Sequence, residues 1–548
     1  MNEFAATPSP TVDDVYPSDA SEMQLPLCDR VEVTDLSGDF SLPDYQPEIK
    51  RLLRITASVL PPARYATADG VELSGNVDYF VLYTGNDNEL YCAPLTTEYR
   101  LNVLPDDDVR AHMIPGGEPQ IVCTCDTVTE AVNGRVTAPR RLNIKTRLRS
   151  HVKAYGPGTV NGGMDGNLSP ASLERLTEDI PSGRLFVGLS DLMTLQDDMI
   201  LSPNEQGEMR VVCAEGQVMV TDALPSDNTV TCRGEVALKL TLCPVAVNSD
   251  LSEAVPSAAI PTVTVRKIPF TQAVELPGVT SACTACAHGR CADLSVEVED
   301  GRLHMEVGVV LEAMAERNEQ VSYAKDLFST RRETVCRYTD RHVSRAIRCL
   351  NGNFTLSDSL PLTEVGIDPS ARVVDVTAVA LPTELTVDKN RYVLSGVCRC
   401  HLLLHRDGEY ASAEMELPFR YEAEGRPGDL SLDSEDGMTP VFGGSITVPA
   451  CRARMDGERI GIDAELAVCL RLSALGRLTA LSDVTFGDDV TRRSGEYVIC
   501  FPAPTDTLWS VAKRYHAPMA VLTAANNLSS ASPADAAESL EGVGYLIV

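Results

Sequence analysis

Three short sequence markers recur along this chain in the same order and at nearly the same spacing. The first, a polar stretch ending in proline, occurs at Phe40–Pro43, Ile200–Pro203 and Asp358–Pro361. The second, a glycine inside a strand-like run, occurs at Gly75, Gly234 and Gly396. The third, an amide or acidic residue before glycine, occurs at Asn133–Gly134, Asp300–Gly301 and Asp456–Gly457. Their separations are 160 and 158, 159 and 162, and 167 and 156 residues. This common period predicts three diverged copies of one domain.

The segments after the second and third markers alternate between apolar and polar residues. They cover 77–83, 236–242 and 397–402, and then 142–148, 303–307 and 460–466. A period of two is typical of antiparallel strands with one buried face, and Asn-Gly or Asp-Gly pairs favour hairpin turns. We therefore expect a mainly β fold with three tandem, antiparallel, sandwich-like repeats. One helical turn is expected at Glu48–Arg54, where Ile49, Leu52 and Leu53 fall on one side.

The chain of 548 residues is too long for one domain. The predicted parts are an acidic mobile leader at 1–24, β repeats at 25–155, 186–330 and 345–490, and a small module at 495–548. Linkers are expected at about 156–171 and 424–439, because glycine, proline and acidic residues gather there without periodicity.

The charge of the chain narrows its partners and its location. It has 78 acidic and 47 basic residues, a formal net charge of −31. Such a surface repels phosphate backbones and anionic lipid, so we expect no nucleic-acid or membrane-surface partner. No stretch has the roughly 20 apolar residues of a membrane span, and residues 1–22 lack the basic and apolar regions of a secretory signal. The 17 cysteines, an odd number, are expected to be reduced thiols in a cytosolic protein.

The pattern changes to a β-α-α-β unit after residue 496. A strand is expected at Tyr497–Cys500, and Asp506 and Thr507 place short oxygen side chains where a helix needs a cap. The first helix has one apolar face, made by Leu508, Val511, Ala512 and Tyr515. The second begins near Pro518, turns Val521, Leu522 and Ala525 inward, and ends at Asn526–Asn527 before a strand at Gly544–Val548.

This unit resembles a LysM domain over residues 496–548. The resemblance rests on Asp506–Tyr515, Leu522, Asn526, Leu528 and the final strand. Thr505 stands where the family has glycine, and the link from Tyr497 to Asp506 is about three residues longer than usual. Trp509, the only tryptophan, either packs the module or contacts a ligand. The binding residues expected from the resemblance are Thr505, Asp506, Thr507, Leu508, Trp509, Asn526, Asn527, Leu528 and Ser529.

A second resemblance lies near the N-terminus. Residues 42–59 are similar to the opening of a repeat domain of unknown function from endospore-forming bacteria. Such repeats with one C-terminal LysM domain resemble a clostridial family of spore-coat morphogenetic proteins. The resemblance implies a non-catalytic adaptor in the mother-cell cytosol, at the forespore surface and spore coat. Its LysM domain would bind the coat-basement ATPase, stage IV sporulation protein A.

The alternative is that the LysM domain binds N-acetylglucosamine glycans of peptidoglycan. A wall binder requires export, and Thr505 replaces the usual glycine, so the adaptor is the preferred hypothesis.

Catalytic and metal-binding motifs are scarce in the sequence. It has no nucleophile elbow, Walker loop, HExxH or dinucleotide fingerprint, so we expect no enzyme and no cofactor. The cluster Cys283, Cys286, His288 and Cys291 has the ligand types of a zinc site, but nine residues form a very tight clip. Reduced cysteines in a loop before a strand are the preferred interpretation. The carboxylates of Asp106–Asp108 are expected to be solvated rather than metal-bound.

Overall fold

A computed structural model describes most of the chain. The described residues are 22–67, 70–104, 121–160, 172–201, 209–244, 260–299, 301–388, 391–425, 439–490, 498–528, 540 and 543–548. Residues 1–21 of the predicted leader and most of both predicted linkers therefore lie outside the described residues, whereas residues 22–24 of that leader belong to a strand. Among the described residues, no helix is both long and apolar enough to cross a membrane.

Antiparallel strands dominate the fold and form three units. Unit 1 contains β1 (Glu22–Ser41), β2 (Arg51–Val59), β3 (Ala63–Thr67), β4 (Gly70–Thr84), β5 (Leu90–Val103), β6 (Val122–Ala138) and β7 (Arg141–Thr159). Unit 2 contains β8 (Leu173–Leu189), β9 (Met193–Ile200), β10 (Met209–Ser226), β11 (Thr229–Pro244), β12 (Thr262–Glu275), β13 (Thr284–Glu299) and β14 (Arg302–Ser329). Unit 3 contains β15 (Arg332–Pro361), α2 (Leu362–Val365), β16 (Arg372–Asp388), β17 (Arg391–Arg406), β18 (Glu409–Glu424), β19 (Thr439–Asp456) and β20 (Arg459–Asp489).

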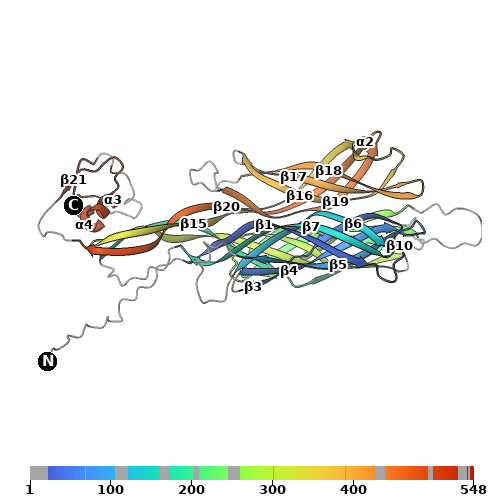
Figure 1. Ribbon diagram of the computed structural model, residues 1–548, viewed down its shortest axis with the longest axis horizontal. Helices are drawn as coiled ribbons and strands as arrows, with labels where there is room; N and C mark the ends of the chain where they lie inside the picture. Colours follow the sequence, from blue (N-terminus) through green and yellow to red (C-terminus); the bar gives the residue numbers. More distant parts are fainter. Residues whose placement is uncertain are drawn as a thin grey trace, which may run out of the picture.

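A small α/β module follows the three units. It contains β21 (Ile499–Cys500), α3 (Leu508–Arg514), α4 (Met519–Ala525) and β22 (Leu546–Ile547). The two short strands pair antiparallel, with Cys500 opposite Leu546. In Figure 1 this module sits at one end of an elongated molecule, where the long strands β15 and β20 extend towards it.

Each unit has two sheets with the same strand order. In one sheet, the last strand of the unit pairs on one side with the first strand of the unit and on the other side with the second-to-last strand. The orders are β1-β7-β6, β8-β14-β13 and β15-β20-β19. In unit 2, β9 also pairs with β14. The other sheet is a three-strand meander in units 2 and 3, β10-β11-β12 and β16-β17-β18. In unit 1, β2 and β3 pair with one side of β4 and β5 pairs with the other.

The two sheets of each unit share one apolar core. Val81 and Leu148 belong to that of unit 1, Leu240 and Leu311 to that of unit 2, and Leu402 to that of unit 3. All six alternating segments predicted from the sequence lie in strands, within β4, β11 and β17 and within β7, β14 and β20. The expectation of a mainly β fold is therefore confirmed.

The glycines of the second marker lie opposite large aromatic residues. Gly75 faces Tyr99, Gly234 faces Phe270, and Gly396 faces Phe419 on the neighbouring strand. A Cβ atom at Gly396 would lie 2.4 Å from both the Phe419 ring and the Leu381 carbonyl oxygen. A Cβ atom at Gly234 would lie 2.8 Å from the Phe270 ring. Each ring thus covers a bare stretch of backbone, which explains why glycine stands there.

The third marker is a hairpin turn in only two of its three positions. Gly301 and Gly457 have φ values of 72° and 59° and lie in tight turns before β14 and β20. The turn predicted at Asn133–Gly134 is wrong, because both residues lie inside β6. The corresponding turn in unit 1 is at Pro139–Arg140. Gly134 lies against β2 instead, where a Cβ atom would lie 2.2 Å from the Cδ1 atom of Ile55.

Two other local expectations differ from the structure. The helical turn predicted at Glu48–Arg54 is wrong, because β2 begins at Arg51 and pairs with β4. A β-bulge at Leu53 places Leu53 and Arg54, two successive residues, in the interior, which imitates a helical pattern. The strands also extend beyond the predicted repeat limits. β1 begins at Glu22 and β7 ends at Thr159, β8 begins at Leu173 rather than 186, and β15 begins at Arg332 rather than 345.

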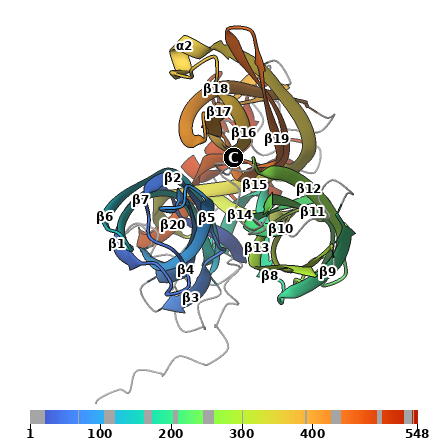
Figure 2. The same ribbon diagram turned by 90° about the vertical axis from the view of Figure 1, so that its right-hand side faces the viewer.

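The three units surround a common centre, as Figure 2 shows. Apolar side chains from all three units meet there in separate clusters. One joins Leu53, Val212 and Leu403, another joins Tyr155, Met314 and Cys469. Between these units, the guanidinium group of Arg54 contacts Asp375 at 3.0 Å and Glu215 at 3.2 Å. Lys239 contacts the other oxygen of Asp375 at 2.8 Å. We call Arg54, Glu215, Lys239 and Asp375 the central ion cluster.

Candidate functional site

Helix α3 organises the C-terminal module. Its N-cap is Thr507, whose side chain accepts a hydrogen bond from the Ser510 backbone N–H at 3.1 Å. The Ser510 hydroxyl in turn accepts one from the Thr507 N–H at 2.9 Å, which completes a capping box. The predicted inward face is confirmed: Leu508, Val511 and Ala512 are buried and Tyr515 packs against them.

Asp506 stabilises the loop before α3 rather than capping the helix. Its carboxylate pairs with the Arg514 guanidinium at 2.6 Å and accepts the Ala503 N–H at 2.9 Å. These hydrogen bonds hold the pKa of Asp506 below its usual range. Because both carboxylate oxygens already have partners, Asp506 has a structural role in this conformation.

Trp509 fastens the module to β14 of unit 2. Its side chain is only 6% exposed and its ring packs edge-on against Phe328 of β14, with 5.0 Å between ring centroids. The indole Nε1–H donates a hydrogen bond to Asp326 Oδ2 at 2.8 Å. An edge-to-face aromatic pair and a satisfied indole N–H are both favourable at a buried contact. The packing alternative foreseen for Trp509 is the one that this geometry favours.

Further contacts extend this attachment along the same side of the module. Lys513 Nζ lies 2.6 Å from Asp326 Oδ1, and His516 Nδ1 lies 2.8 Å from the Ser329 carbonyl oxygen. The Met519 N–H donates to Glu174 of β8 at 3.2 Å. Burial alone would raise the pKa of Asp326, but hydrogen bonds from Lys513, Trp509 and Tyr338 outweigh it and hold the pKa below its usual range.

The other predicted binding residues fall into two groups. Leu508 is buried in the core, and the Asn526 side chain joins α4 to β22 through hydrogen bonds with the backbone N–H and C=O of Ile547. Thr505 and Asn527 are exposed, and Leu528 is partly buried against the module core. Ser529 lies outside the described residues.

An apolar surface faces solvent on the outer side of the β21–β22 pair. We call Ile499, Phe501, Ala525, Tyr545 and Ile547 the outer apolar face; they line one open pocket. Phe501 is 75% exposed, and Ile499 and Tyr545 are each 58% exposed. Exposed aromatic and aliphatic side chains gathered in one place mark interaction sites more often than single ones do.

This face was not predicted from the sequence. Val521 and Ala525 were expected to point inward, which is wrong: Val521 is 59% exposed and Ala525 is also exposed, while Leu522 alone of the three is buried. The signal was present in the terminal strands. Val498–Phe501 and Tyr545–Val548 are apolar at successive positions, a pattern typical of strands covered on both faces. The two helices cover only one of those faces.

The candidate zinc ligands do not converge. They belong to β13 or lie directly before it, rather than in a loop. Cys283 packs in the core of unit 2, whereas Cys286 packs between the units against Cys469 and its neighbours. His288 pairs with the carboxylate of Glu312 at 3.4 Å. Within the part of the chain that is described, no three His, Cys, Asp or Glu residues are grouped as metal ligands. Asp106–Asp108 lie outside it.

Comparison with known proteins supports the module alone. Residues 503–533 match the LysM domain family. No curated protein and no solved structure matches the chain. The chain therefore carries a LysM domain, attached through Trp509 to β14 of unit 2.

Proposed function

We propose that this chain is a non-catalytic adaptor in which a rigid β body carries a LysM domain as its binding tip. The observation that carries the proposal is that one side of the module is attached to the β body and another side is free. Its α3 side is fastened to the body through Trp509, Lys513 and His516, while its outer apolar face remains open. A binding domain held in this way presents its free surface in one fixed direction.

The β body, made of units 1, 2 and 3, is suited to act as a rigid spacer. We infer that units 1, 2 and 3 are diverged copies of one sandwich-like domain. Their common strand order supports this, and so does a β-bulge that recurs at Leu53, Val212 and Val374 with the same separations as the marker glycines, 159 and 162 residues. Buried apolar clusters and the central ion cluster join the three copies. These contacts favour one rigid body over three domains that move independently.

A protein partner is the first candidate ligand. Phe501 and Tyr545 are aromatic residues of the kind enriched at protein interfaces. The resemblance to spore-coat morphogenetic proteins makes the coat-basement ATPase the partner to test, with coat assembly in the mother-cell cytosol as the setting.

A glycan is the second candidate, and the family match at 503–533 favours it. Thr505 and Asn527 offer exposed hydrogen-bonding groups, and the module also exposes aromatic side chains, Phe501 and Tyr545, on which sugar rings can stack. Peptidoglycan, as an N-acetylglucosamine polymer, is the glycan to test.

The deciding experiment uses the full-length chain and the double variant Ile499→Ser/Phe501→Ser. Immobilised purified coat-basement ATPase and insoluble peptidoglycan are offered separately. Leu192→Ser is the matched control, because Leu192 is 57% exposed but lies in unit 2. We expect the ATPase to retain the unmodified chain and the control but not the double variant.

Each other outcome is also informative. Retention of the double variant by the ATPase would exclude the outer apolar face as the docking surface. Co-sedimentation with peptidoglycan and no retention by the ATPase would replace the protein partner with a glycan. Retention by neither ligand would contradict both candidates.

A further inference from the structure

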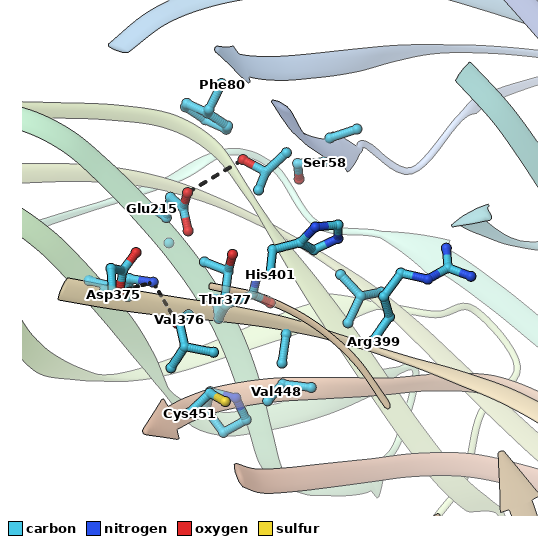
Figure 3. Close-up of a pocket in the computed structure, with 18 of the residues that line it drawn as sticks. Ser58, Phe80, Glu215, Asp375, Val376, Thr377, Arg399, His401, Val448 and Cys451 are labelled. Atoms are coloured by element: carbon cyan, nitrogen blue, oxygen red, sulfur yellow. Dashed lines mark hydrogen bonds and ion pairs between the residues drawn. The ribbon is translucent and has the colours of Figure 1, made fainter. Parts of the chain in front are cut away.

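A large cavity lies where the three units meet. Its volume is about 1640 Å³, and every unit contributes to its wall. Figure 3 shows Glu215 of unit 2 together with Ser58 of unit 1 and Thr377 of unit 3 around this space. Small-molecule pockets commonly have volumes of roughly 300–1,000 Å³, so this cavity is large enough for a segment of polypeptide.

Strand edges, rather than sheet faces, form much of the wall. Runs of consecutive residues line it: Ile55–Ser58, Thr129–Asn133, Glu215–Gln217, Cys291–Leu294, Val373–Val379 and Val448–Arg454. Successive side chains of a strand point to opposite faces of its sheet. A consecutive run therefore lines a cavity where the edge of the strand is turned towards it.

These runs belong to β2, β6, β10, β13, β16 and β19, and each is the outer strand of its sheet. In each unit two of these strands lie next to each other: β2 and β6, β10 and β13, and β16 and β19. Among the described residues, no backbone hydrogen-bond ladder joins the two strands of such a pair. β-Bulges interrupt all six strands, at Leu53 and Glu130 in unit 1 and at corresponding places in the other units. Open edges carry backbone N–H and C=O groups that can pair with an added strand.

The charge of the wall indicates the chemistry of the occupant. Nine carboxylates line the cavity: Asp78, Glu130, Glu215, Asp293, Asp375, Glu414, Glu416, Asp463 and Glu465. Only five lysine or arginine residues do so: Lys239, Lys267, Arg399, Arg452 and Arg454. Burial lowers the pKa of His401, which favours its neutral form. Arg54 and Arg149, which lie outside the wall, also pair with carboxylates of this set. The remaining excess of two carboxylates attracts a cationic ligand.

We propose that this cavity binds an extended, basic segment of a partner protein, which pairs through its backbone with an open strand edge. Valine and isoleucine side chains such as Ile55, Val376 and Val448 take alternate apolar residues of that segment. The carboxylates take its lysine or arginine residues. This is strand addition, a recurring mode of peptide recognition, and it is independent of the LysM domain.

The test measures fluorescence anisotropy of labelled nine-residue peptides with the full-length chain. The probe alternates lysine and valine. One comparison peptide alternates glutamate and valine, and another has the probe sequence with alternate backbone nitrogens methylated, which prevents pairing along one edge. We expect the probe to bind and the acidic peptide not to bind. The methylated peptide should bind at least about tenfold more weakly than the probe.

Paired variants locate the site. Asp293→Lys/Glu414→Lys reverses two carboxylates at the cavity, on β13 and β18. Glu297→Lys/Glu409→Lys makes the same charge change on the same two strands at exposed positions outside the cavity wall. We expect the first variant to bind the probe about tenfold more weakly and the second to bind it as the unmodified chain does. Circular dichroism checks that both are folded.

Several results would overturn the proposal. Failure of the probe to bind would mean that water fills the cavity. Equal binding of the methylated peptide would exclude backbone pairing. Equal losses in the two double variants would indicate attraction by the overall charge of −31 rather than a site. If the cavity variant does not fold, the comparison between peptides on the unmodified chain still decides the question.

Discussion

The indole N–H of Trp509 donates a hydrogen bond to the carboxylate of Asp326, 183 positions earlier in the chain. This contact joins the LysM domain to β14, and Lys513 shares the same carboxylate. Because Trp509 is the only tryptophan in the chain, its fluorescence reports on this attachment alone. The orientation of the binding tip can therefore be followed in the intact protein.

Loss of the aromatic contact is expected to release the module. In Phe328→Ala the edge-to-face pair disappears and water reaches the indole ring. We expect the emission of Trp509 to shift to longer wavelength and its quenching by acrylamide to increase under native conditions. Phe354→Ala is the control, because Phe354 packs against Phe419 and Tyr421 within unit 3. An unchanged spectrum in Phe328→Ala would show that Phe328 does not hold the module.

Acid is expected to weaken the same attachment. The pKa of Asp326 is lowered in the docked state, because hydrogen bonds from Lys513 and Trp509 outweigh the effect of burial. Because its pKa is lowered, Asp326 stabilises the docked state at any pH above its ordinary pKa, near 3.8. This stabilisation is lost as the pH falls through the lowered pKa that Asp326 has in the docked state. We expect the Trp509 emission to shift to longer wavelength below about pH 4.

Asp326→Asn isolates this effect from that of other ionisable groups near the attachment, such as Glu174. The variant has no carboxylate to protonate, so its emission should already be shifted at pH 7 and should change less in acid. The same acid transition in the unmodified chain and in Asp326→Asn would assign it to another group.

The sequence contains enough information for the strands but not for the way they assemble. Alternation such as that of Val77–Tyr83 identifies a strand because its burial follows from its own side chains. The helices of the LysM domain were predictable for the same reason: Thr507 and the spacing of Leu508 and Val511 are local signals. The turn predicted at Asn133–Gly134 was wrong because Gly134 lies inside a strand and contacts Ile55, a residue on another strand.

Contacts between units left no local trace. Nothing near Trp509 indicates Phe328 as its neighbour, and nothing near Arg54 indicates Asp375. The cavity likewise depends on six strand edges from three units. Such features arise from tertiary packing, which a single sequence does not specify by periodicity.

The central ion cluster is expected to hold the units together. Arg54 is buried between Glu215 and Asp375, and removal of one partner from a buried pair leaves an uncompensated charge. We expect Arg54→Ala to cost about 3–5 kcal/mol in the free energy of unfolding. Arg147→Ala is the matched control, because Arg147 and Asp35 form an exposed pair within unit 1. Urea unfolding followed by circular dichroism measures both, and equal midpoints would contradict a structural role for the cluster.

The close contact at Gly396 leads to a prediction about the glycine marker. The Cβ atom of Gly396→Ala would lie 2.4 Å from the Leu381 carbonyl oxygen, which is backbone and cannot rotate away. The strand must therefore shift, and overpacking of this kind costs about 1–3 kcal/mol. Gly461→Ala, also in unit 3, has no neighbour of its Cβ atom nearer than 3.8 Å and should leave stability nearly unchanged. Thermal unfolding of the two variants measures the difference. If Gly396→Ala were as stable as Gly461→Ala, neither the Leu381 carbonyl group nor the Phe419 ring would be the reason for glycine at this position.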